Sequence, residues 1–393
     1  MNMGKRGVIR SLFFILLFLF PLLAGNPCAA LDPFPTYPCL EPNVRFWVDA
    51  YTKYPTTKGI VHDATDLNIV YGVIDLLPHD KPGTQLINEQ RIRAAKEHYR
   101  KILEDLAENS DSQDPEKRRV AHLFGTSAGP DAFREAIGNI RCQVGQKDRF
   151  ERGLIRSGAY LHKIRAIFRS HGLPEDLCYL PHVESSFDVT AFSKAGAAGI
   201  WQFTRATGKK FLTVNKFLDE RRDPILASEA AAKLIKSNYA RLGDWPMTIT
   251  AYNHGITGML RAKREMGTYD AVFQDYGGKR FGFASRNFYP EFLAARHVAK
   301  NCTEYFGHVR LNKSLEAREV VVKGETSFAD LSHRYEVDLE TLRALNPALG
   351  RPVFKGQRQV PKGYVLHLPA DSAKGLMVSS AAHPPIHPDL REE

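Results

Sequence analysis

Apolar residues recur with helical spacing along most of the chain. The clearest predicted helix lies between Asn88 and Asn109. Its apolar stripe consists of Ile92, Ala95, Tyr99, Ile102 and Leu106. Charged residues lie mostly off that stripe, as on a helix that packs one face against a core. We therefore expect residues 43–145 to be mostly helical, and we interpret His62 and Asp63 as a surface pair.

A second predicted helix runs from Phe150 to His171 and ends at Gly172, a common stop signal. Pro174 is suited to the first turn of the following helix. Pro181 is expected to kink or break that helix, because proline lacks a backbone N–H and crowds the preceding turn. Glu184 is therefore predicted to project from a helix end into a space between elements.

Helix signals continue downstream and then change in kind. Asp223 and Pro224 are a cap and first-turn pair that opens a long helix ending at Gly243, and Trp245 begins another. Beyond Arg318 the pattern predicts a small β-α-α-β unit. Its strands are expected at 320–322 and 364–368, and its helices at 327–335 and 339–345. Residues 370–393 have no periodicity and are predicted to be disordered.

The first thirty residues differ in composition from the rest. Three basic residues precede an apolar run from Leu12 to Ala24 that is too short to span a bilayer comfortably. This is the pattern of a secretory signal peptide, residues 1–30, with cleavage expected after Ala30; an uncleaved anchor is the alternative. Removing three basic residues from the net charge of +10 leaves +7. The export signal and the absence of a dense basic stripe argue against nucleic acid as a partner.

Four cysteines lie beyond the signal sequence, at Cys39, Cys142, Cys178 and Cys302. They allow three disulfide pairings, and their spacing does not choose among them. Cys178 lies in an apolar run and fits a buried thiol at least as well as a disulfide. No cofactor or metal is predicted, because His182 and His254 lack the partners of a metal site such as an HExxH helix.

The candidate chemistry is concentrated between Leu180 and Phe203. Glu184 stands between the apolar Val183 and Phe187, and burial disfavours the charged form of a carboxyl. A carboxyl that stays protonated near neutral pH can donate its proton to a glycosidic oxygen. The loop 195–199 lacks the ending of a phosphate-binding loop, so its small residues indicate close approach of the backbone to a ligand or to Glu184.

Several blocks in this order resemble known motifs. Three blocks resemble the signature motifs of the family 1 lytic transglycosylases: Glu184-Ser185, Gly199-Ile200-Trp201-Gln202 and Ala251-Tyr252-Asn253. The similarity continues to the block at 281–292. Residues 319–369 resemble a LysM peptidoglycan-binding domain. The pairing of these two units is similar to that in the membrane-bound lytic murein transglycosylase D group.

The resemblance implies a mainly α fold. A lysozyme-like helical catalytic domain (SLT domain), related to goose-type lysozyme, would occupy residues 150–310. A helical region at 31–149 would precede it, and the LysM domain at 319–369 would follow. The implied protein is an exported enzyme of the periplasm or cell envelope. Its partner would be the glycan strands of peptidoglycan, with association to the cell wall or outer membrane.

The resemblance also implies the roles of individual residues. In this family a single glutamate acts first as acid and then as base, so Glu184 would cleave between MurNAc and GlcNAc and leave a 1,6-anhydro end. The residues expected to orient the acid or bind the substrate are Ser185, Gln202, Tyr252, Asn253, Trp201 and Tyr289. Trp201 fits sugar stacking and core packing equally well. Tyr252, by its helix position alone, also fits a core role.

Two other functions fit parts of the pattern. A hydrolytic muramidase or chitinase-like enzyme on the same fold would recruit a second carboxylate such as Asp188. A non-catalytic wall-binding protein would depend on the LysM unit alone. Among the other acids, Asp223 is best explained as a helix cap, and Glu220 as part of an ion-pair network with its arginine neighbours.

Overall fold

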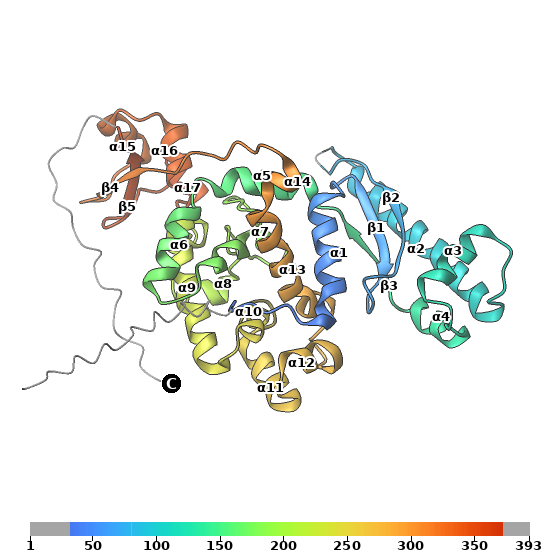
Figure 1. Ribbon diagram of the computed structural model, residues 1–393. Helices are drawn as coiled ribbons and strands as arrows, with labels where there is room; N and C mark the ends of the chain where they lie inside the picture. Colours follow the sequence, from blue (N-terminus) through green and yellow to red (C-terminus); the bar gives the residue numbers. More distant parts are fainter. Residues whose placement is uncertain (1–31, 80, 372–393) are drawn as a thin grey trace, which may run out of the picture. The chain divides into compact units, whose positions relative to one another are not determined.

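The computed structural model describes residues 32–79 and 81–371 and is mainly helical, as predicted (Figure 1). The predicted signal peptide and nearly all of the predicted disordered tail lie outside the described residues. No helix within the described ranges is long and apolar enough to cross a membrane. The thiols of Cys39, Cys142, Cys178 and Cys302 are all free, and Cys178 is buried.

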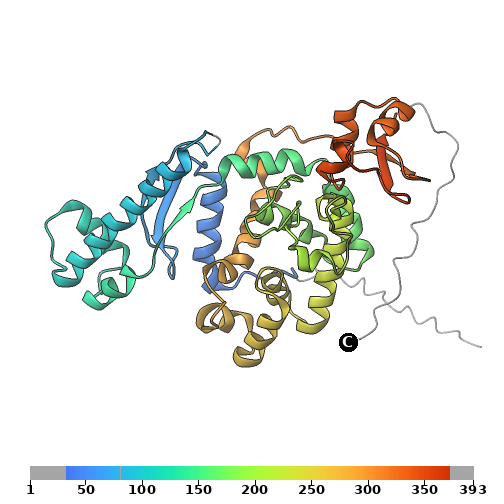
Figure 2. The ribbon, with the colours of Figure 1, turned by 180° about the vertical axis from the view of Figure 1, so that it is seen from behind.

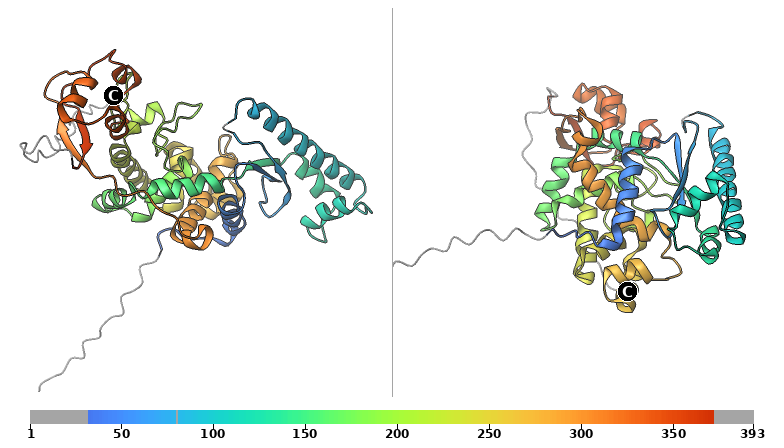
Figure 3. Two further views of the ribbon diagram at one scale, coloured as in Figure 1. Left: turned by 90° about the horizontal axis from the view of Figure 1, so that it is seen from above. Right: turned by 45° about the vertical axis from the view of Figure 1, so that its right-hand side comes forward.

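The segment before residue 146 combines helices with a small sheet. Its elements are η1 (Pro38–Leu40), α1 (Glu41–Thr52), β1 (Lys58–Asp63), β2 (Val70–Asp75), α2 (Thr84–Glu108), α3 (Pro115–Leu123), α4 (Pro130–Ile137) and β3 (Ile140–Val144). The strands are antiparallel in the order β2-β1-β3, and α2 runs along the sheet (Figures 1, 2 and 3). The helix predicted between Asn88 and Asn109 is confirmed as α2. The sheet was missed, because central β1 is buried at five of its six positions and shows no alternation.

The interpretation of His62 and Asp63 as a surface pair was wrong, because both side chains are buried. One carboxylate oxygen of Asp63 accepts a hydrogen bond from the backbone N–H of Thr65 at 2.7 Å. The other accepts a hydrogen bond from the Tyr71 hydroxyl at 3.3 Å. The pair therefore holds the end of β1 against its neighbours.

The central helical body follows. Its elements are α5 (Lys147–Ser157), α6 (Leu161–Ser170), η2 (Glu175–Tyr179), α7 (Leu180–Glu184), α8 (Arg205–Gly208), η3 (Glu220–Arg222), α9 (Pro224–Leu242), α10 (Trp245–His254), α11 (Ile256–Met266), α12 (Tyr269–Asp275), α13 (Phe283–Lys300) and α14 (Cys302–Phe306). The single helix predicted from Phe150 to His171 is in fact two, α5 and α6. They separate at Gly158, where a Cβ atom would lie only 2.4 Å from the carbonyl oxygen of Asn312. The chain after α14 packs against this break.

Helix α13 packs against α1, α7 and α10, and Figure 1 shows α1 and α13 side by side. The buried Asn287 of α13 accepts hydrogen bonds from Asn43 Nδ2 at 2.8 Å and from Trp47 Nε1 at 3.2 Å. These bonds satisfy polar groups that would be costly to bury alone. Helix α1 therefore belongs to the packing of the central helical body.

The predicted β-α-α-β unit is present, with one further short helix. It consists of β4 (Ala317–Val321), α15 (Phe328–Tyr335), α16 (Leu339–Leu345), α17 (Arg351–Phe354) and β5 (Val365–Pro369), with β4 and β5 antiparallel. Leu218 forms an isolated β-bridge with Leu349, and Phe217 O accepts a hydrogen bond from Gly350 N at 2.7 Å. The unit is therefore in direct contact with the loop before α9.

Candidate active site

Glu184 is the last residue of α7, and the break predicted at Pro181 lies at the start of this helix, where η2 gives way to α7. The 3-10 turn η2 starts after Pro174, and α7 follows with Pro181 in its first turn. The chain then turns sharply, because Ser186 and Phe187 adopt positive φ angles of 50° and 56°. Non-glycine residues in this region are strained, and such strain is concentrated at functional sites. The turn sets Glu184 at the end of its helix, as predicted.

Glu184 is half-buried, and its protein surroundings raise the pKa of its carboxyl to about 8. The cause is desolvation, which disfavours the charged form. The carboxyl is therefore protonated at neutral pH and able to act as a general acid. The buried Tyr51 and the half-buried Tyr252 lie close enough to feel its charge. Burial is the main cause of the raised pKa of both phenols; the charge of Glu184 adds to it for Tyr252, and the charges of Glu291 and then Glu184 add to it for Tyr51.

A second carboxyl, Glu291 of α13, lies within electrostatic reach of Glu184. Burial, and then the charge of Glu184, raise the pKa of Glu291 to about 8. Glu291 was not among the residues predicted from the sequence. The sequence signal was the same as for Glu184, an isolated acid in an apolar run (FYPEFLAA). The structure adds that the helix carrying Glu291 packs against α7.

Three predicted site residues bind the backbone of one short loop, 199–202. Ser185 Oγ donates a hydrogen bond to Ile200 O at 3.0 Å. Gln202 Nε2 donates to Gly199 O at 2.8 Å. The Tyr252 hydroxyl donates to Trp201 O at 2.8 Å. Ser185, Gln202 and Tyr252 therefore hold the loop beside Glu184, and Gln202 itself has a positive φ of 46°.

Asn253 follows Tyr252 at the end of α10 and its side chain is exposed. Its Oδ1 accepts a hydrogen bond from Ser285 Oγ at 3.0 Å. Ser285 Oγ is also 3.2 Å from Nδ1 of His254. These contacts orient the Asn253 amide at the surface, where it can meet a ligand.

Two predicted substrate contacts were wrong. Trp201 is fully buried, and its Nε1 donates a hydrogen bond to Ser228 Oγ at 2.8 Å, so its ring is core and cannot stack on a sugar. Tyr289 is also fully buried, and its hydroxyl donates to Pro35 O at 2.8 Å. Tyr289 therefore anchors the segment before α1.

The small-residue loop approaches protein backbone. Gly199 has φ +74°, and a Cβ atom there would lie 1.9 Å from the carbonyl oxygen of Arg221. The buried Arg221 donates from Nη1 to Gly196 O at 2.8 Å and to Phe203 O at 2.9 Å. It also pairs with Asp219 through Nε and Nη2 at 2.8 and 2.7 Å. Arg221 thus closes the base of the loop, and its ionic partner is Asp219, not the predicted Glu220.

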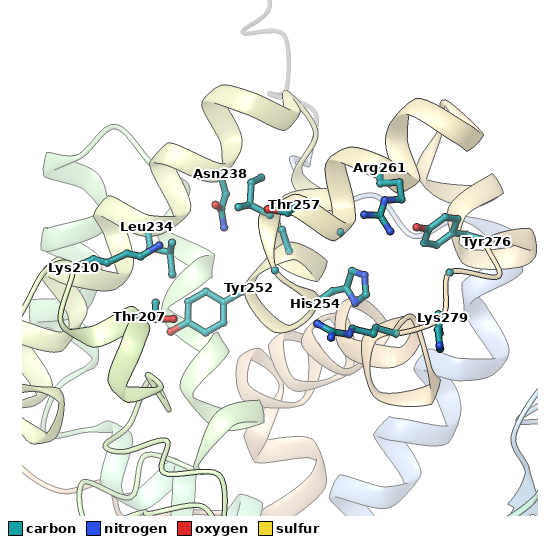
Figure 4. Close-up of a pocket in the computed structure, with 16 residues that line it drawn as sticks. Thr207, Lys210, Leu234, Asn238, Tyr252, His254, Thr257, Arg261, Tyr276 and Lys279 are labelled. Atoms are coloured by element: carbon teal, nitrogen blue, oxygen red, sulfur yellow. The ribbon is translucent and has the colours of Figure 1, made fainter. Parts of the chain in front are cut away.

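A cleft of about 560 Å³ opens beside Tyr252 (Figure 4). Its walls come from α9, α10, α11 and the segment 276–280. Glu184 itself does not line the cleft, but Tyr252 lines it and its phenol feels the charge of Glu184, so the acid lies behind the Tyr252 end of the cleft. This geometry fits an extended ligand with one reactive bond near Glu184.

The rival acids have structural roles. Asp188 Oδ1 accepts hydrogen bonds from the backbone N–H and the hydroxyl of Thr190 at 2.9 and 2.7 Å. Asp223 caps α9, as predicted, by accepting from Ile225 N at 2.8 Å and Leu226 N at 2.9 Å. These bonds account for both carboxylates without a catalytic task.

Comparison with known proteins confirms the SLT resemblance. The model of the family "Transglycosylase SLT domain" matches residues 164–272. "Membrane-bound lytic murein transglycosylase D" from each of two Escherichia coli strains is 28% identical over 197 residues, which is 49% of this chain and 43% of the relative. The chain thus spans less than half the length of these curated relatives. An X-ray structure of an inactive mutant of the lytic transglycosylase Slt from Pseudomonas aeruginosa aligns with a TM-score of 0.31 and 14% identity, covering 39% of this chain and 26% of that one.

Proposed function

We propose that this protein is a peptidoglycan lytic transglycosylase that cleaves the β-1,4 bond between MurNAc and GlcNAc. The observation that carries the proposal is a desolvated acid, Glu184, with a pKa of about 8, at a strained helix end within the SLT-matching segment. Digestion of purified sacculi followed by mass spectrometry of the released muropeptides tests it. Products with 1,6-anhydro ends are expected.

The proposed reaction needs one carboxyl in two successive roles. Protonated Glu184 donates its proton to the glycosidic oxygen, and the bond from that oxygen to C1 of MurNAc breaks. The resulting carboxylate then takes the proton of the C6 hydroxyl of the same MurNAc. The C6 oxygen forms a new bond to C1, so Glu184 ends protonated and no water is consumed. The nucleophile is intramolecular, which favours attack through proximity.

The neighbouring residues serve this reaction by position. Ser185, Gln202 and Tyr252 hold the loop 199–202 beside the acid through their bonds to its backbone. The exposed Asn253 amide is available for an N-acetyl group of the sugar. We assign Ser185, Gln202 and Tyr252 as positioning residues and Asn253 as a substrate-binding residue.

A hydrolytic muramidase is the second candidate, because Glu291 supplies another carboxyl near Glu184. Hydrolysis generally needs one protonated and one ionised carboxyl. Burial holds the pKa of both groups at about 8, so Glu291 is also protonated at neutral pH and poorly suited to act as base or nucleophile. This supports the single-acid reaction. Asp188, the second carboxylate predicted for such an enzyme, instead accepts hydrogen bonds from Thr190 within its own backbone turn.

Replacing Glu291 by glutamine is expected to move the alkaline limb of the kcat/KM profile to lower pH. The charge of Glu184 raises the pKa of Glu291, and repulsion between two like charges is reciprocal. Ionised Glu291 therefore opposes loss of the Glu184 proton, and glutamine cannot carry that charge. In the wild type, activity should fall above about pH 8 as Glu184 ionises. The matched control is Glu304→Gln on α14, an exposed acid in another helix. A limb that stays in place or moves to higher pH in Glu291→Gln would contradict the coupling.

We also propose that residues 319–369 bind peptidoglycan and that the protein acts in the cell envelope after export. The test uses Glu184→Gln, which should bind without cutting, as the full chain and as a chain ending at residue 316. The shorter chain is expected to sediment less with purified sacculi. Because the unit covers Phe217 and Leu218, circular dichroism must show that the shorter chain stays folded. Equal sedimentation of two folded chains would exclude a wall-binding role for this unit.

A further inference from the structure

The cleft beside Tyr252 has a strongly one-sided charge. Four cations line it, Lys210, Arg261, Lys279 and Arg280, and none of its lining residues is an aspartate or glutamate. All four side chains are exposed, and none is ion-paired with a carboxylate within residues 32–79 and 81–371. Cations of one sign in a concave site add their potentials and attract anions.

The cations are unevenly distributed along the cleft. In Figure 4, Arg261 and Lys279 lie on the same side of the cleft as Tyr276, while Lys210 lies on the opposite side with Thr207 and Tyr252. Tyr252 marks the end nearest Glu184, since its phenol feels that charge. Desolvation alone raises the pKa of Glu184, so none of the four cations lies close enough to its carboxyl to shift that pKa. The Arg261 end is therefore set apart from the reacting bond.

The Arg261 end suits carboxylates better than neutral sugars. Guanidinium groups bind carboxylates through paired N–H donors, and lysine adds a point charge. His254, between the two ends in Figure 4, does not add charge at neutral pH, because burial lowers the pKa of its imidazole. The positive potential therefore comes from lysine and arginine alone.

We propose that Arg261, Lys279 and Arg280 bind the carboxylates of the peptide stems on the glycan strand. This inference rests on the proposed function and specifies its substrate, strands that bear anionic peptides. A neutral aminosugar polymer has no carboxylate that could bind the cations at this end of the cleft. The contacts lie away from the scissile bond, so they lower KM and leave kcat nearly unchanged.

The test compares two forms of soluble, peptide-bearing glycan strands. One form is native, and in the other the stem carboxylates are converted to neutral methylamides with a carbodiimide. Wild-type protein is expected to show a KM about tenfold higher on the neutralised strands, since exposed ion pairs contribute modestly and three are lost. The triple variant Arg261→Gln, Lys279→Gln, Arg280→Gln is expected to show this higher KM on both forms.

The control is Arg264→Gln, which removes an exposed arginine of α11 that does not line the cleft. Arg264→Gln should keep the wild-type preference, a lower KM on the native strands than on the neutralised strands. A triple variant that also keeps the preference, or a wild type that cleaves both forms with equal KM, would overturn the inference while leaving the proposed function intact. If the wild type yields 1,6-anhydro ends from neither form, the proposed function itself fails.

Discussion

Glu184→Gln is expected to lower the rate of release of muropeptides from sacculi by on the order of 10²-fold or more. Glutamine has nearly the shape of the protonated acid, but it cannot give up a proton to the glycosidic oxygen or take one from the C6 hydroxyl. Both steps are therefore lost in one substitution. The measurement is the initial rate of soluble product formation at pH 6 to 7, where wild-type Glu184 is protonated.

Two controls separate lost chemistry from lost folding. Asp188→Asn should retain nearly all activity, because Asp188 serves a local turn. The pKa of folded Glu184 lies above its ordinary value of 4.5, so ionisation costs the folded state stability as pH rises towards 8. Glutamine does not ionise, so Glu184→Gln should melt at or above the wild-type temperature at pH 8. Retained activity in Glu184→Gln would remove Glu184 from the mechanism.

Arg221→Met is expected to lower the free energy of unfolding by about 3–5 kcal/mol, the usual cost of removing one partner of a buried ion pair. The arginine is 2% exposed, and methionine would fill its space but remove the charged side-chain donor shared by three acceptors. These are the carboxylate of Asp219 and the carbonyl oxygens of Gly196 and Phe203. Urea unfolding followed by circular dichroism measures the change.

Arg222→Met is the matched control, because the adjacent Arg222 has a half-buried side chain outside this set of bonds. It should unfold within about 0.5 kcal/mol of the wild type, as most surface changes do. Arg221 also donates hydrogen bonds to both sides of the loop that Ser185, Gln202 and Tyr252 hold in place. The fraction of Arg221→Met that remains folded should therefore have reduced activity. Equal stability of the two variants would show that Arg221 does not hold the loop.

Features with local causes were readable from the sequence. The Asp223 cap depends on backbone N–H groups two and three residues away. The start of α7 is marked by Pro181 in its first turn. The long α2 follows from its own apolar stripe. In each case the interacting groups are close in the chain, so residue type and spacing suffice.

Features with distant partners were not readable. The break between α5 and α6 depends on Asn312, which packs against Gly158 from beyond α14. Strand β3 pairs with β1, although α2, α3 and α4 lie between the two strands in the sequence. The loop residue Trp201 is core, and its N–H is bonded by Ser228 on the distant helix α9. Nothing in the local sequence distinguishes such a tryptophan from one that stacks on a ligand.

The proximity of Glu291 to Glu184 is of the same kind. The two acids are far apart in the chain and meet because α13 packs against α7. Their shared signal, a lone acid in an apolar run, identifies groups with raised pKa values but not which pair will meet. The cationic end of the cleft likewise joins Arg261 of α11 to Lys279 and Arg280 in a later loop.

The most direct test of the central claim is digestion of sacculi in water enriched in heavy oxygen. If the C6 hydroxyl of MurNAc is the nucleophile, the new ends are 1,6-anhydro rings, lighter than reducing ends by one water and free of label. Mass spectrometry of the first products should therefore find unlabelled anhydromuropeptides. Labelled reducing ends in their place would show that water attacks C1, and would contradict the single-acid account of Glu184.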